Sequence, residues 1–118
     1  LLLQTITVLW IIWGAVHARA GVLTITQGAP APISGIADAV DPTLFHGTYQ
    51  AATDALVNQH GFNLLWIGVF TVIGGVFIWR GSVTWLFFTT LISGAAIVLS
   101  AIAYFLGMTG RDAAPSAG

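Results

Sequence analysis

The sequence predicts an all-α integral membrane protein with three transmembrane helices and one interfacial amphipathic helix in the loop between the first and second spans. Hydrophobic residues make up 57% of the 118 residues and charged residues only 6%, whereas about 25% of a typical soluble domain is charged. Three apolar segments are each close to the roughly 20 residues that cross a bilayer. The segment between the first two is polar and has helical periodicity. At this length, residues 1–118 form a single membrane domain.

The first span is predicted over residues 1–25. Its run IIWGAVHARAGVLTI places His17 and Arg19 inside an otherwise apolar stretch. This segment lacks the basic start of a cleavable signal peptide and has an arginine near its end, so we expect a membrane helix. The abrupt opening LLLQ indicates that a few residues precede Leu1.

The second and third spans are predicted over residues 61–79 and 83–108, and neither contains a charged residue. Only the tripeptide RGS separates them, which predicts a tight antiparallel hairpin. Trp79 and Trp85 flank this turn, where an indole ring suits the headgroup level of a bilayer. For Trp10, Trp13 and Trp66, which lie inside the spans, packing is the favoured interpretation over ligand contact.

The connection over residues 26–60 is predicted to be an interfacial loop followed by a helix, and we call it the lid. Asp41 followed by Pro42 is a helix-start signal. Beyond it, apolar and polar side chains recur on separate faces at three- and four-residue spacing, as in an amphipathic helix that lies in the membrane interface. The polar face is the series His46, Gln50, Asp54 and Asn58.

Orientation in the membrane has little charge to set it, because the chain has three basic side chains and no lysine. A connection as long as the lid without lysine is unusual for a cytoplasmic loop. We therefore expect the lid and the C-terminal tail, residues 109–118, on the non-cytoplasmic side. The tail is predicted to be short and mobile.

Small residues form stripes on the second and third spans. In a membrane, such stripes allow close approach of another helix, where lipid offers no hydrophobic contrast. Packing within the hairpin is the favoured interpretation, and a docking face for a partner subunit is the alternative. The stripe of the third span is Thr89, Ser93, Ala96, Ser100, Ala103 and Gly107, and that of the second is Gly68, Thr71 and Gly75.

The predicted topology gathers most polar side chains in one layer, at the end of the first span and the start of the second. Burying an unpaired arginine at the bilayer centre costs roughly 2.5–3.5 kcal/mol. Arg19 is therefore expected to snorkel, or to pair with an aspartate of the lid (Asp38, Asp41 or Asp54) or with a partner's acidic group; the alternative is that it holds an anionic headgroup or substrate. The candidate ligand or docking residues of the layer are His17, Arg19, His46, Asp54, His60 and Asn63.

A metal site is a minor hypothesis. His17, His46 and His60 could supply three nitrogen ligands with an aspartate as the fourth, but their spacing matches no established metal motif. An inward His17 could also ligate a haem or chlorin. The sequence requires no cofactor, and it contains no Ser-His-Asp arrangement and no glycine-rich phosphate loop.

These features favour a non-catalytic accessory or structural subunit of a larger integral membrane complex, for instance a redox or oxygenase assembly. Its expected partners are the lipid bilayer and other membrane subunits. Three arginines cannot track a phosphate backbone, which excludes nucleic acid. One alternative is a small membrane enzyme or lipid-binding protein that uses the His/Asn/Arg layer under the lid. A metal or pigment carrier is the third hypothesis.

Overall fold

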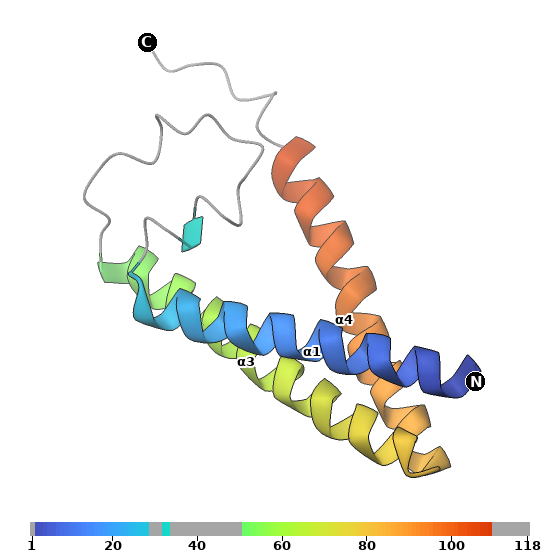
Figure 1. The fold of residues 1–118 in the computed structure, drawn as a ribbon. Helices are drawn as coiled ribbons and strands as arrows, with labels where there is room; N and C mark the ends of the chain where they lie inside the picture. The colour runs from blue at the N-terminus through green and yellow to red at the C-terminus, as the bar shows by residue number, and fades with distance from the viewer. Residues whose placement is uncertain (1, 29–31, 34–50, 110–118) are drawn as a thin grey trace.

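Three long helices make up the fold in the computed structural model, which describes residues 2–28, 32–33 and 51–109. They are α1 (Leu2–Thr26), α3 (Ala51–Trp79) and α4 (Val83–Thr109) (Figure 1). The described residues contain no strand. Each helix has a segment long and apolar enough to cross a membrane, and in α4 this segment ends at Ala103. The prediction of an all-helical chain with three such helices is confirmed, and the fold is compatible with a multi-pass membrane protein.

The second long helix begins at Ala51, earlier than the sequence predicts. Residues 51–60, expected in a separate interfacial helix, form the first turns of α3, because no proline interrupts the helix. At the junction, Gly61 lies against Thr24 of α1. At 1.5 Å per residue the 29 residues of α3 span about 43 Å, more than the ~30 Å of a hydrocarbon core. The rest of the predicted lid helix, with Asp41 and His46, lies outside the described residues, as do Asp38 and the tail from residue 110.

Helices α1 and α3 run antiparallel side by side (Figure 1), and glycines line their contact. A Cβ atom at Gly14 would lie 2.7 Å from the carbonyl oxygen of Gly68, and one at Gly21 would lie 2.5 Å from that of Gly61. Such distances exclude a side chain, so glycine alone permits this backbone approach. The glycines recur every seven residues on both helices, at 14 and 21 and at 61, 68 and 75, as in a left-handed helix pair.

The structure assigns the small residues of α3 to two different neighbours. Gly68 and Gly75 face α1, where Ala18 and Ile11 respectively are among the atoms nearest to them. They do not form the hairpin contact with α4 that the sequence favours. That contact uses Gly74, which packs against Thr89, and Thr71.

The turn between α3 and α4 is as tight as predicted. Gly81 has a φ of +87°, and the amide of Ser82 donates to the carbonyl of Phe77 at 3.0 Å, which closes the end of α3. The Ser82 hydroxyl then accepts a hydrogen bond from the Trp85 amide at 3.3 Å and caps α4. The Trp85 ring stacks on Phe77 with a centroid distance of 5.0 Å.

Beyond its first turns α4 diverges from the α1–α3 pair (Figure 1). Its fully buried side chains, Thr89 and Ser93, lie in its first half, whereas Ser100 and Ala103 are exposed. The helices thus form a close pair with a third helix splayed from it.

Candidate functional site

Three adjoining hollows lie beside α1, and α4 contributes to the walls of two of them. We call the three together the wedge. The first, of about 370 Å³, runs along α1 from Val16 to Gln27 and includes Leu64 of α3. The second, of about 560 Å³, has only apolar side chains from Ile6 to Val16 of α1 and from Ile97 of α4. The third, of about 170 Å³, lies between α1, α3 and α4.

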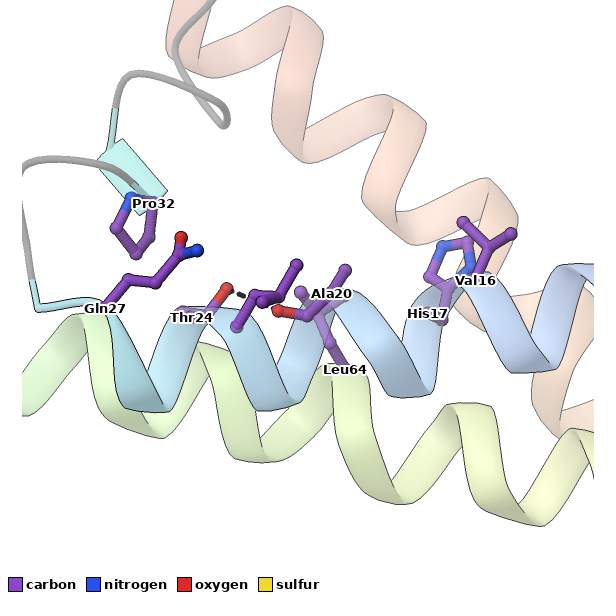
Figure 2. A pocket seen from close by; sticks show the side chains of 8 residues that line it. Val16, His17, Ala20, Thr24, Gln27, Pro32 and Leu64 are labelled. Atoms are coloured by element: carbon purple, nitrogen blue, oxygen red, sulfur yellow. Dashed lines mark hydrogen bonds between the residues drawn. The ribbon is translucent and has the colours of Figure 1, made fainter.

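His17 stands where these hollows meet. It lines the first and third hollows, while Trp13 lines the second and third. Figure 2 shows the imidazole ring rising from α1 toward the side on which α4 runs. Across the third hollow, α4 contributes Ala96, Ile97 and Ser100. A half-buried histidine therefore faces a space bounded by all three helices.

The hydrogen bond of His17 fixes which ring nitrogen carries the proton. Nδ1 lies 2.9 Å from the carbonyl oxygen of Trp13. A carbonyl oxygen can only accept, so Nδ1 must be the donor, and in the neutral ring Nε2 keeps its lone pair. No described residue forms a hydrogen bond with Nε2. His17 thus presents at the wedge an acceptor that no residue in the described part of the chain uses.

An aromatic row holds this histidine in place. The Trp13 ring stacks on His17 with a centroid distance of 3.8 Å and an interplanar angle of 27°. Trp10 meets Trp13 edge-on, at 6.2 Å and 86°. Both indoles are half-buried and line the apolar second hollow. From the sequence, these tryptophans are expected to be packing residues. The i, i+4 spacing of Trp13 and His17 is the sequence signal for their contact.

The described members of the predicted polar layer lie apart from one another. Gly61 packs against Thr24, and Gly68 packs against Ala18, so His60 and His17 lie about two helical turns apart along the α1–α3 pair, roughly 10 Å. They cannot share one metal ion, because histidine ligands lie about 2.0–2.1 Å from it. Among the described residues, no group of three or more metal-ligating side chains is present.

The remaining polar residues have separate surroundings. Arg19 is exposed and forms no ion pair with any residue that the structure describes. Asn63 is exposed and accepts a hydrogen bond from the Trp66 indole at 3.3 Å. Asp54 is half-buried in the first turn of α3, and His60 is exposed. His46, the third histidine of the predicted metal set, lies outside the described part of the chain.

No protein-family model matches the chain, and no curated protein or solved structure matches it. The fold defines a class, a small helical protein compatible with multiple membrane crossings. Its function is inferred from the geometry of α4 and the wedge.

Proposed function

We propose that the chain is a multi-pass membrane protein and acts as a non-catalytic subunit of a larger membrane complex. The second half of α4 would receive a helix of the partner. One observation carries this proposal: the small-residue stripe of α4 is buried against α3 only in its first half, at Thr89 and Ser93, and is exposed at Ser100 and Ala103.

An exposed stripe of small residues is a poor surface against lipid. Small side chains give up van der Waals contact unless another helix backbone comes close, and helix association in membranes depends on such contact. Within this chain the divergence of α4 prevents α1 and α3 from providing it. A partner helix at Ala103 would restore the close packing that Thr89 and Ser93 already have, whereas Ser100 lines the third hollow.

Arg19 provides further support. It lies seven residues before the end of α1, about 10 Å along the axis, and its side chain is exposed. An arginine at this depth is favourable when it snorkels to the interface or meets a carboxylate. An acidic side chain of a partner subunit would satisfy it, as would the lid.

The test is purification of the tagged chain from its native membrane in mild detergent, followed by mass spectrometry. We expect stoichiometric membrane partners with the wild-type chain. Ala103→Leu should lose them, because the larger side chain blocks close approach. Ala101→Leu makes the same chemical change about 160° away around α4, at an exposed position, and should retain them. A wild-type chain that purifies as a stable monomer or homo-oligomer without partners would contradict the proposal, as would equal effects of the two substitutions.

A further inference from the structure

We propose that the wedge binds a lipid-soluble phenol or quinol. Its hydroxyl group would donate a hydrogen bond to Nε2 of His17, its ring would lie in the third hollow, and its apolar tail would lie in the second. This inference relies on the membrane insertion proposed above but not on a partner subunit.

The polar end of the site selects a hydrogen-bond donor. Because Nδ1 of His17 donates to the Trp13 carbonyl at 2.9 Å, the neutral ring has only an acceptor left for a ligand. In apolar surroundings an acceptor without a partner is costly. The Ser100 hydroxyl lines the same hollow and offers a second polar group. A hydroxyl group on the ligand can donate to Nε2 of His17, whereas a carbonyl group can only accept and has no donor at that nitrogen.

The size of the third hollow selects a single ring. An apolar cavity of about 150 Å³ is known to hold one benzene molecule, and the third hollow measures about 170 Å³. Trp13 forms part of its wall and stacks on His17, so a ring placed here would meet aromatic faces and edges. An aromatic hydroxyl therefore fits better than the end of an aliphatic alcohol.

The second hollow supplies room for a tail. It adjoins the third through Trp13 and Ile97, measures about 560 Å³, and has no polar side chain in its wall apart from the indoles of Trp10 and Trp13. It runs along α1 from the level of His17 toward the N-terminus. The wedge thus offers, in this order, the polar acceptor of His17, a hollow the size of one ring and an apolar groove. This order matches a ligand that has a hydroxyl group on a ring and an apolar chain attached to that ring.

The experiment measures retention of decylubiquinol by lipid nanodiscs that hold the full chain with any co-purifying subunits, against empty nanodiscs, under anaerobic reducing conditions. We expect saturable retention by the wild type. Decylubiquinone, which has only acceptors, is measured without the reductant and should bind about tenfold more weakly. His17→Phe keeps a ring but removes Nε2, and it should abolish the preference for the quinol. His60→Phe makes the same change on α3 outside the wedge and should leave retention unchanged.

A second variant tests the site if His17→Phe fails to fold. Ala96→Leu leaves His17 intact and fills the third hollow from α4, so it should reduce retention of the quinol at least tenfold. His17→Gln, whose amide oxygen can accept a hydrogen bond, should restore part of the quinol preference. The proposal is overturned by equal or tighter binding of the quinone, by equal effects of His17→Phe and His60→Phe, or by no retention above that of empty nanodiscs.

Discussion

Thr71 and Ser93 share a buried hydrogen bond of 2.6 Å that joins α3 to α4. The Thr71 hydroxyl also donates to the carbonyl of Ile67 at 2.7 Å, so its proton is used within α3. Ser93 must therefore be the donor between the helices. This bond lies in the half of α4 that packs on α3, and beyond it the helices separate (Figure 1).

Ser93→Ala should destabilise the hairpin. Hydrogen bonds between transmembrane helices contribute about 0.6 kcal/mol on average and up to about 1.7 kcal/mol. We expect a loss in this range, because Thr71 keeps its bond to Ile67 and no buried donor is left unpaired. The free energy of unfolding in mixed micelles measures it. Ser100→Ala removes the same hydroxyl from an exposed position and should have no effect, and a similar loss in both variants would contradict the assignment.

Gly21→Ala should destabilise the α1–α3 pair by about 1–3 kcal/mol, the usual cost of overpacking. The added methyl group would lie 2.5 Å from backbone atoms of Gly61 and Leu65, and backbone cannot move aside as a flexible side chain can. Gly94→Ala on α4 is the control, since no atom lies within 4 Å of the added carbon. The same unfolding measurement compares the two variants. If Gly94→Ala costs as much as Gly21→Ala, close backbone approach is not what the glycines provide.

Arg19→Gln should reduce the amount of assembled complex in the membrane, because a neutral amide cannot satisfy an acidic partner or the interface. Arg19→Lys keeps the charge and should retain most of it. Arg80→Gln, at the turn after α3, removes the same charge at the opposite end of the α1–α3 pair and should leave assembly unchanged. Quantitative mass spectrometry of affinity-purified membranes gives the readout. Full assembly with Arg19→Gln would show that Arg19 does not contribute to binding of the partner.

Sidedness can be tested because the chain contains no cysteine. We expect Ala113→Cys, in the C-terminal tail, to react with a membrane-impermeant maleimide in intact cells. Arg80→Cys should react only after the membrane is permeabilised, since α4 separates the two positions. The reverse pattern would place the lid and the tail on the cytoplasmic side. Reaction of both positions in intact cells would contradict the crossing of the membrane by α4.

The sequence was sufficient for the three apolar helices and the turn at Arg80–Ser82, because length, apolar composition and a short polar interruption are local signals. It was not sufficient for the start of α3. The alternation of polar and apolar residues before Gly61 is the same for a separate helix and for the first turns of a longer one. A single glycine does not decide between them, since glycine weakens a helix without ending it.

The partners of each helix face were also beyond the sequence. The spacing of Gly68 and Gly75 defines a face, but whether α1 or α4 covers that face depends on which neighbour fits it across the whole interface. The divergence of α4 also depends on fit across a whole interface. No local pattern in the sequence could therefore predict the hollows around His17. The expectation that Arg19 and His60 lie in one layer assumed that the end of the first span and the start of the second lie at the same level. The pairing of Gly68 with Ala18 instead places His17 about two turns further along the pair than His60.

The seven-residue glycine repeat leaves the alignment of α1 along α3 ambiguous by one period. A displacement of one repeat, about 10 Å, would bring Gly14 to Gly75 and Gly21 to Gly68, and glycine would again meet glycine. The evenly spaced glycines therefore determine how closely the two helices approach, but they do not determine the register in which the helices pair. That choice depends on contacts between unlike residues, such as Ile11 with Gly75 and Thr24 with Gly61.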